Sequence, residues 1–374
     1  MNKKVLVVDD SALMRKLLRQ ILEEAGYEVA TAKDGYEAIE LNRTFQPDVI
    51  TLDINMPRMD GLTALSHIML ERPVPVVMVS SLTEDGALIT LEALNLGAVD
   101  YVTKPGGTIS LNIDMIKDEV LSKVKTAQLA RVSRARTIVR KIREEREKVR
   151  PDKISLQVTG EEGVVIIGGS TGGPRTLEEI LPKLPENFPL PVVVCQHMPG
   201  VFTKSFAERL DKFCQLKVVE VDKLLPVERG VIYIAKGNAD MVFTRRGGKL
   251  MLQPVPERPE YLWHPSVELL GKSALEHIPP PKIIAVMLTG MGYDGAEAFA
   301  EIKKKGGKTI AESEESAVVF GMPKELIERE GATVILPADK IARQLINWSK
   351  ALIQEEAKNA HKKTGERKTS SNNH

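Results

Sequence analysis

The chain has 374 residues, enough for two or three domains, and its apolar fraction of 43% and charged fraction of 28% are typical of a globular protein. Its 52 basic and 51 acidic residues nearly cancel, which excludes binding to nucleic acid or an anionic membrane through a global charge. The two cysteines, Cys195 and Cys214, fit neither a disulfide framework nor a zinc site, and no apolar run approaches the roughly 20 residues of a membrane helix. Because the N-terminus also lacks a signal peptide, we expect a cytoplasmic protein without membrane insertion. We also expect it to be a monomer.

Residues 1–122 alternate short aliphatic runs with amphipathic segments of helix length. The predicted strands lie in "KVLVVDD", "YEVATA", "DVITLD", "VPVVMVS" and "AVDYVTK". This alternation predicts βαβ units and a parallel sheet. The runs lack period-two patterning, as expected of strands that are covered on both faces.

Polar side chains stand at the predicted carboxyl ends of these strands, namely Asp9, Asp10, Asp53, Ser80 and Lys104. In an open parallel sheet this edge lines the ligand crevice. Clustered carboxylates favour Mg²⁺, and a carboxylate can attack a phosphoryl group to give an aspartyl phosphate. Helix capping explains one aspartate taken singly but does not explain the five positions together.

The stretches "VLVVDDS", "DVITLDINMPRMDG", "VVMVSS" and "DYVTKP" resemble the receiver domain of bacterial response regulators along its whole length. The resemblance implies that Asp53 accepts a phosphoryl group from the histidine kinase of a two-component system. It further implies that Asp10 and Asp53 hold Mg²⁺ with help from Asp9, and that Ser80 and Tyr101 form the switch pair, with Lys104 at the phosphate.

Residues 123–158 differ in character, because "RVSRARTIVRKIREEREKVR" contains nine basic and three acidic residues. We interpret them as a solvated, helical linker. A DNA-binding response regulator is the alternative, but the stretch has no aromatic residue and the second half of the chain has no convincing helix-turn-helix. The tail at 351–374 is polar, and its part "KNAHKKTGERKTSSNNH", residues 358–374, is expected to be disordered.

Between 159 and 350 the alternation returns in "VVIIGG", "PVVVCQ", "IIAVMLTG", "KTIAES" and "ATVILP". Within it, "DMVFTRRGGKLMLQP" predicts a β-hairpin. The glycine-rich loop "GGSTGGP" has neither Walker nor dinucleotide spacing, whereas Gly168, Ser170 and Gly172 fit G-x-S-x-G on a strand-to-helix turn. The loop is therefore predicted to present a serine nucleophile.

His197 and Asp294 follow other predicted strands at the edge that carries Ser170, so a base and an orienting carboxylate are available there. A helix cap, a turn residue or a structural histidine explains each position singly. His264 remains a reserve base, and Cys195 an alternative nucleophile. The order Ser, His, Asp differs from that of α/β-hydrolases.

The stretches "IGGSTGGP", "QHMPGVFTKSFAERLD", "HPSVELL", "LTGMGYDGA" and "ESAVVFGMP" resemble the protein-glutamate methylesterases of bacterial chemotaxis. The resemblance implies that Ser170 attacks, His197 transfers the proton and Asp294 fixes the imidazole tautomer. It places Met291 and Thr171 near the oxyanion, with no cofactor for ester hydrolysis.

Together the resemblances imply two doubly wound α/β domains, a flavodoxin-like receiver and a Rossmann-like methylesterase domain with a hairpin insertion. They imply demethylation, and also deamidation, of methyl-accepting chemotaxis receptors, with a chemotaxis histidine kinase as phosphodonor and a receiver that inhibits until Asp53 is phosphorylated. Tyr293 departs from the asparagine frequent in that family. A non-catalytic binding module is the remaining alternative.

Overall fold

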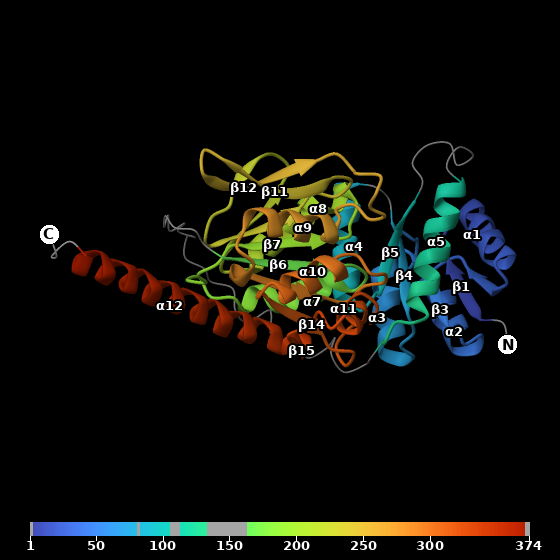
Figure 1. Cartoon of the computed structure of the whole chain (residues 1–374). Helices are drawn as coiled ribbons and strands as arrows, with labels where there is room; N and C mark the ends of the chain where they lie inside the picture. Colours follow the sequence, from blue (N-terminus) through green and yellow to red (C-terminus); the bar gives the residue numbers. More distant parts are fainter. Residues whose placement is uncertain (1–2, 81–82, 105–112, 133–162, 371–374) are drawn as a thin grey trace.

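The computed structural model describes residues 3–80, 83–104, 113–132 and 163–370. Most of the expected linker at 123–158 therefore lies outside the described residues. Two α/β domains follow each other along the chain (Figure 1). None of the described helices is both long enough and apolar enough to cross a membrane.

The first domain is a five-stranded parallel sheet in the order β2-β1-β3-β4-β5, which confirms the expected flavodoxin-like topology. Its strands are β1 (Lys4–Val8), β2 (Glu28–Ala32), β3 (Val49–Asp53), β4 (Val76–Ser80) and β5 (Asp100–Thr103). Its helices are α1 (Ala12–Glu24), α2 (Gly35–Thr44), α3 (Gly61–Glu71), α4 (Glu84–Leu96) and α5 (Ile113–Ala127).

Capping residues fix where the helices of this domain begin. The side chains of Ser11, Asp34 and Asp60 accept backbone N–H groups at the starts of α1, α2 and α3. Helix α5 runs beyond the expected boundary at residue 122, because Val124 and Ala127 are fully buried in the core beneath the sheet.

The second domain is a seven-stranded parallel sheet in the order β15-β14-β13-β6-β7-β10-β8. Its strands are β6 (Val164–Gly169), β7 (Val192–Gln196), β8 (Lys217–Val221), β10 (Val231–Ala235), β13 (Ile283–Met287), β14 (Lys308–Glu312) and β15 (Val334–Leu336). Its helices include α7 (Gly173–Ile180), α8 (Gly200–Phe213), α9 (Val267–His277), α10 (Ala296–Lys304) and α11 (Met322–Glu328). Strands β8 and β10 are additions to the five expected from the sequence.

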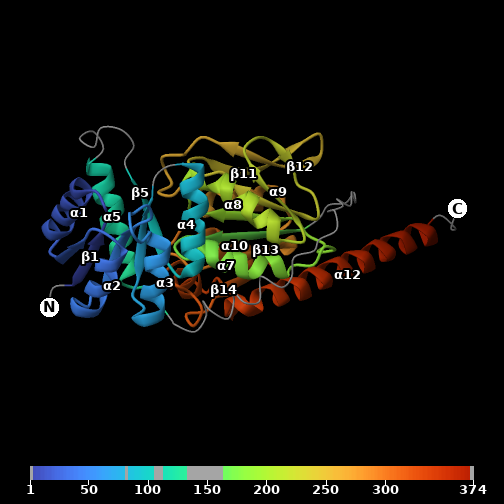
Figure 2. The ribbon, with the colours of Figure 1, turned by 180° about the vertical axis from the view of Figure 1, so that it is seen from behind.

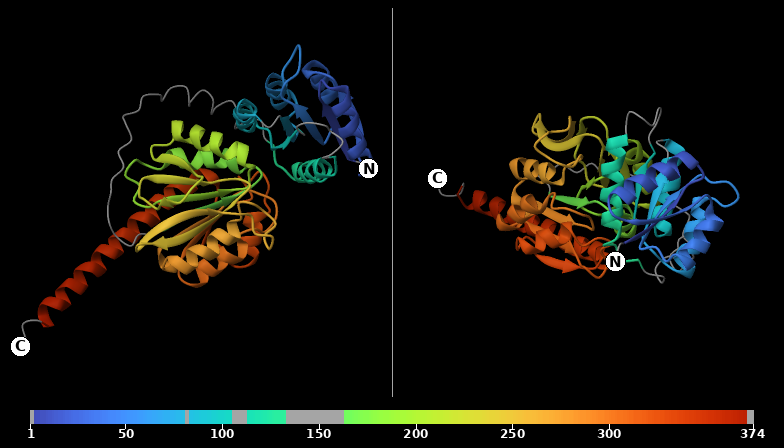
Figure 3. Two further views of the ribbon diagram at one scale, coloured as in Figure 1. Left: turned by 90° about the horizontal axis from the view of Figure 1, so that it is seen from above. Right: turned by 90° about the vertical axis from the view of Figure 1, so that its right-hand side faces the viewer.

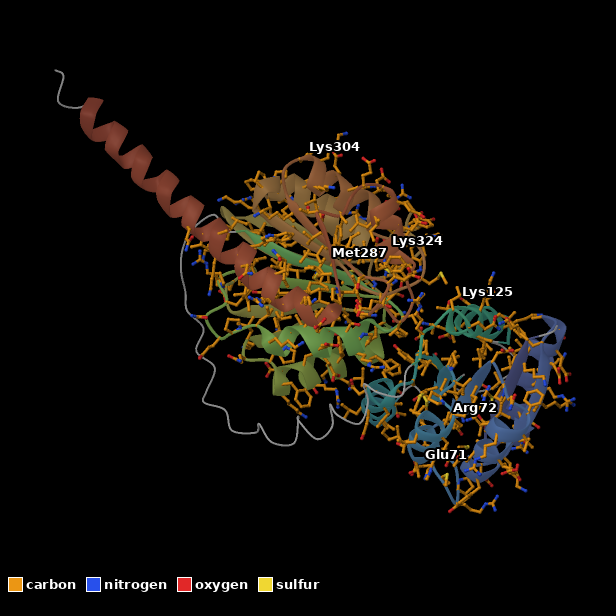
Figure 4. The ribbon with its side chains drawn as sticks, turned by 90° about the horizontal axis from the view of Figure 1, so that it is seen from below. Glu71, Arg72, Lys125, Met287, Lys304 and Lys324 are labelled. Carbon is orange, nitrogen blue, oxygen red and sulfur yellow. The ribbon has the colours of Figure 1, made fainter. Side chains whose placement is uncertain are left out.

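The expected hairpin is present as β11 (Asp240–Arg246) and β12 (Lys249–Val255). A short strand, β9 (Leu225–Pro226), pairs with β12 and completes a three-stranded antiparallel sheet. Fully buried side chains of the domain include Met287 on β13, labelled in Figure 4. The insertion therefore adds to an α/β domain that keeps its own parallel sheet.

The two domains pack directly against each other. Helix α4 of the first domain lies along α8 and α7 of the second, as seen from behind in Figure 2. Asn95 donates to Glu178 at 2.8 Å, and Glu178 also accepts from Arg209 at 2.8 Å. The rings of Tyr101 and Phe202 pack across the contact with centroids 4.5 Å apart and planes tilted by 33°.

The end of the chain forms a long helix, α12 (Ala338–Ser370), which projects from the second domain (Figure 3). The expectation of disorder for residues 358–374 is wrong for residues 358–370, which α12 includes. Leu345 and Leu352 are buried and Ile353 packs against the same core, so the apolar face continues past residue 350. Alanine, glutamate and lysine, all strong helix formers, follow in the sequence.

Candidate active site

Three neighbouring strands bring the predicted catalytic residues to one edge of the sheet. Ser170 follows β6, His197 follows β7, and Asp294 lies in the loop after β13. Strand β6 is paired with β13 on one side and β7 on the other, where the chain reverses its direction of progress through the sheet. This is the position at which open α/β sheets bind ligands.

Asp294 is held at the start of α9 and orients His197. Its carboxylate accepts from the Ser266 hydroxyl at 3.0 Å and from the backbone N–H groups of Val267 and Glu268 at 2.7 and 3.0 Å. The Nε2 atom of His197 lies 2.8 Å from Asp294 Oδ2. Because a helix N-terminus favours negative charge, its N–H groups hold the carboxylate in place beside the imidazole.

The other imidazole nitrogen, His197 Nδ1, is buried and has no hydrogen-bond partner among the described residues. It is the nitrogen left to accept a proton from a nucleophile. No hydrogen bond between Ser170 and His197 occurs among the contacts of those residues, and such bonds often tighten only when substrate binds.

The Ser170 loop makes a sharp turn into α7. Gly172 adopts φ 81°, and a β-carbon there would lie 2.6 Å from Val318 Cβ. The Gly173 N–H donates to Ser170 O at 2.7 Å, and Ser170 N–H donates to Thr289 O at 3.0 Å. The glycines therefore permit a turn that any side chain would obstruct.

Two buried residues that were not predicted from the sequence brace this turn. The Gln196 side-chain amide donates to Ser170 O at 2.9 Å and to His197 O at 3.1 Å. The Thr289 hydroxyl donates to Thr171 O at 2.9 Å. A polar residue at the end of an apolar strand was the available signal for Gln196, but it does not reveal the hydrogen-bond partners.

The two residues predicted near the oxyanion lie beside this loop. Thr171 is buried, and its hydroxyl donates to Asp100 of the first domain. No hydrogen bond among the described residues uses the Met291 N–H as donor, so that group is available to an oxyanion. Their roles remain predictions.

The alternatives for base and nucleophile are engaged elsewhere. His264 Nδ1 lies 3.1 Å from both carboxylate oxygens of Asp240. Cys195 is fully buried and donates to Pro265 O at 3.3 Å. Burial, and then the nearby carboxylates, hold the pKa of this thiol well above its usual range, so it is a poor nucleophile.

The first domain contains the predicted acidic pocket. Carboxylate oxygens of Asp9, Asp10 and Asp53 lie within 4.8 Å of one another. Lys104 Nζ is 3.0 Å from Asp9 and 2.8 Å from Asp53. Burial raises the pKa of Asp53, Lys104 opposes that shift, and Asp9 adds to it. This crowded set of oxygen ligands, one of them exposed, fits Mg²⁺.

The predicted switch residues lie between this pocket and the second domain. Ser80 is buried, with its hydroxyl 3.4 Å from Gly86 O. Tyr101 is buried against Phe202, and burial, followed by the charge of Asp100, holds the pKa of its hydroxyl well above the usual range. The aromatic switch residue is therefore part of the contact between the domains.

The chain matches the family model described as CheB methylesterase over residues 165–345 and that of the response regulator receiver domain over 5–114. It is 56% identical over 355 residues to "Protein-glutamate methylesterase/protein-glutamine glutaminase 3" of Rhodospirillum rubrum, covering 92% of this chain and 96% of that relative. The chain belongs to the CheB family.

The chain is also similar to a relative from Archaeoglobus fulgidus that is named "Protein-glutamate methylesterase/protein-glutamine glutaminase". The two are 43% identical, and the match covers 94% of this CheB chain and 99% of that relative. Among solved structures, the Thermotoga maritima CheB methylesterase catalytic domain is 44% identical, with a TM-score of 0.48, covering 50% of this chain and 98% of that chain.

Proposed function

We propose that this CheB family member is a protein-glutamate methylesterase, and a protein-glutamine deamidase, whose receiver domain controls access to a serine nucleophile. The His197–Asp294 pair beside the Ser170 turn is the observation that carries the proposal. The names of relatives that match nearly the whole chain support the substrate class. The proposed substrates are glutamyl methyl esters and glutamines of chemotaxis receptors, and the proposed location is the cytoplasm.

In the proposed reaction, Ser170 Oγ attacks the ester carbonyl while its proton passes to His197. The tetrahedral intermediate collapses, the C–O bond to methanol breaks, and His197 returns the proton to the leaving oxygen. Water then attacks the glutamyl ester of Ser170, with His197 taking its proton and giving it back to Ser170. Glutamine follows the same path, with ammonia leaving in place of methanol.

The Met291 N–H and backbone groups near Thr171 are proposed to stabilise the oxyanion, and one such donor typically contributes about 10²–10³ in rate. A histidine kinase is the proposed phosphodonor for Asp53. Asp9, Asp10 and Asp53 would hold Mg²⁺, which neutralises charge on the carboxylates and the incoming phosphoryl group.

The proposed inhibition follows from the domain contact. The Asp100 carboxylate of the receiver binds Thr171, the residue directly after the nucleophile, so the receiver lies at the edge of the site. A tenfold change in activity requires a shift of only about 1.4 kcal/mol between docked and released states. Phosphorylation of Asp53 adds about −1.5 to −2 charges and can supply that shift.

The test is methanol release from methylated chemoreceptor, with and without acetyl phosphate and Mg²⁺, for the parent chain, Ser170→Ala and Asp53→Ala. We expect no release by Ser170→Ala and an unstimulated basal release by Asp53→Ala. No release from the parent under any condition would favour a non-catalytic binding module.

A further inference from the structure

An indole ring lies flat against the proposed base. The rings of Trp263 and His197 are stacked with centroids 5.8 Å apart and an interplanar angle of 5°. The His197 side chain is only 9% exposed, with its Nε2 bound to Asp294. Trp263 therefore stacks on the ring of His197, while Asp294 is bound at the edge of that ring through Nε2.

The same indole also packs on the loop that carries Met291 and Asp294. A β-carbon at Gly292 would lie 2.7 Å from Trp263 Cζ2 and 3.1 Å from Cη2, and Gly292 has φ 95°. Only glycine permits both this conformation and this close approach. Trp263 therefore contacts the base on one side and the proposed oxyanion loop on the other.

Hydrogen bonds from a buried carboxylate hold the segment that carries Trp263 in place. Buried Asp240 accepts from Ser266 N–H at 2.9 Å and lies 3.1 Å from His264 Nδ1. Ser266 in turn donates its hydroxyl to Asp294. These hydrogen bonds together set the position of the Trp263 indole relative to the Asp294 carboxylate beside His197.

Tyr293, an exposed residue, packs against the indole of Trp263. Its ring meets Trp263 edge-on, with centroids 5.1 Å apart at 88°, and the residue is 52% exposed. Edge-to-face pairs of this kind are favourable beyond the area that they bury. The indole is therefore restrained by an aromatic neighbour, by Gly292 and by the anchored segment.

We propose that Trp263 is a positioning residue for His197, buttressed by Tyr293, and that it stabilises the imidazolium formed when Ser170 attacks. An indole face attracts a cation within about 6 Å of the ring centroid. A neutral imidazole gains less from this contact than an imidazolium does, so the stacked ring favours the transition state in which the proton moves to His197. This inference rests on the proposed function and adds to it a residue that acts through the base.

The expected effects follow from the strength of such contacts. Trp263→Leu should lower kcat about tenfold with little change in KM, because the ring acts on the proton acceptor and not on the substrate. Trp263→Phe retains an aromatic face and should recover most of the loss. Tyr293→Leu, at an exposed site, should lower kcat about two- to fivefold.

The deciding experiment measures activation of the nucleophile without a protein substrate. The full chain, in acetyl phosphate and Mg²⁺, is treated with an alkyl fluorophosphonate. Ser170 Oγ forms a bond to phosphorus, the P–F bond breaks, fluoride leaves, and the serine proton passes to His197. Fluoride release then reports the rate of attack, and methanol release gives kcat and KM alongside it.

Trp348, the other tryptophan of the chain, provides a matched control. It lies on α12 beneath Lys308, whose Nζ is 5.4 Å from the ring centroid, and is half-buried like Trp263. Trp348→Leu should keep the parent rates. The thermal midpoint of each variant shows whether it is folded at the assay temperature, and if Trp263→Leu is not, Trp263→Phe and Tyr293→Leu decide.

Slower phosphonylation in Trp263→Leu and Tyr293→Leu, with recovery in Trp263→Phe, would support the proposal. Parent phosphonylation rates in folded Trp263→Leu, or in both Trp263→Phe and Tyr293→Leu, would overturn it. A raised KM with an unchanged phosphonylation rate would assign the indole to substrate contact instead. Failure of the parent chain to react at Ser170 would count against the proposed function itself.

Discussion

Asp294 shows how a single carboxylate connects the fold to the proposed chemistry. Four donors converge on its two oxygens, from Ser266, Val267, Glu268 and His197. Three of them are the N-cap and the first two residues of α9, so the start of this helix holds the carboxylate beside the proposed base. Small changes at the start of α9 should therefore alter the position of Asp294 in the proposed active site.

Ser266→Ala tests this link. The Ser266 hydroxyl accepts from Leu269 N–H at 3.2 Å as the helix cap and donates to Asp294 at 3.0 Å. Loss of the cap should cost about 1 kcal/mol of unfolding free energy. Weaker restraint of Asp294 should also lower kcat several-fold, measured by methanol release beside thermal unfolding.

A capping serine elsewhere in the chain supplies the control. Ser11→Ala removes the cap of α1 in the receiver, where Ser11 Oγ accepts from Met14 N–H. It should lower stability without lowering the kcat of the phosphorylated enzyme. If Ser266→Ala loses stability but keeps its full kcat, the hydroxyl is only a cap and the proposed link to catalysis is wrong.

Residues at strand ends could be predicted from sequence, because the carboxyl ends of parallel strands share one edge. That reasoning predicts Ser170, His197 and Asp294 at one edge of the sheet, where the structure has them. It could not place Gln196 or Trp263, since their contacts depend on side-chain direction and on a loop path. Asp240 likewise has no local sequence signal for its bond to His264.

At the level of elements, the start of β5 is part of the contact between the receiver and the catalytic domain. Asp100 and Tyr101 are its first two residues, and they reach Thr171 and Phe202 of the second domain. Asp100 also binds Lys123 of α5 at 2.8 Å. A change of conformation along β5 would therefore alter the contact nearest the nucleophile.

Asp100→Ala should raise the methanol release of the unphosphorylated chain about tenfold. The substitution removes the acceptor for the buried Thr171 hydroxyl, and a hydrogen bond to a charged group contributes about 1.5–3 kcal/mol. The docked state loses this stabilisation and the released state does not. Activity after phosphorylation should change little, because the released state is then already favoured.

Lys123→Met is the matched control, since it removes the partner of Asp100 within the receiver and keeps the bond to Thr171. It should raise basal release much less than Asp100→Ala does. Equal rises in the two variants would trace the effect to loosening of the receiver, and no rise in Asp100→Ala would show that the bond does not restrain the enzyme.

The elements themselves were predictable where apolar runs are long and patterned. Strands β8 and β10 escaped prediction because "KVVEV" and "VIYIA" are short runs in a segment rich in turns and charges. Helix α12 was underestimated because the polarity of the tail outweighed the helix propensity of its alanine, glutamate and lysine residues. Polarity alone therefore does not separate a projecting helix from a disordered tail.

The molecule as a whole is joined through an apolar core that crosses the domain boundary. One cluster of buried side chains includes Leu91 and Leu94 of α4 and Phe202 and Phe206 of α8. Activation must therefore compete with apolar burial as well as with polar contacts. Phosphorylation therefore has to supply a sizeable part of the free energy that holds the receiver docked on the catalytic domain.

Removal of divalent cations tests whether stimulation by acetyl phosphate depends on the receiver's carboxylate cluster. With EDTA, acetyl phosphate should no longer stimulate methanol release, because the proposed phosphorylation of Asp53 uses Mg²⁺ held by the clustered carboxylates of Asp9, Asp10 and Asp53. Basal release should persist, since the proposed Ser170, His197 and Asp294 chemistry uses no metal. Loss of basal release in EDTA, restored by Mg²⁺, would contradict this division.

Separation of the domains is the direct test of inhibition. A fragment that begins at Lys153 lacks α4 and β5, so Thr171 loses its contact with Asp100 and Phe202 its contact with Tyr101. Its methanol release should exceed that of the unphosphorylated chain at least about tenfold, corresponding to about 1.4 kcal/mol of docking energy removed. Acetyl phosphate should have no effect on it.

The fragment exposes apolar side chains that α4 normally covers, so thermal unfolding must first show that it is folded at the assay temperature. The seven-stranded sheet has a second buried core, around Val193 and Met287, that is made entirely of residues from this domain. We therefore expect it to fold. A folded fragment no more active than the unphosphorylated chain would mean that the receiver acts by ordering the active site after phosphorylation, because uncovering it would then have brought no gain.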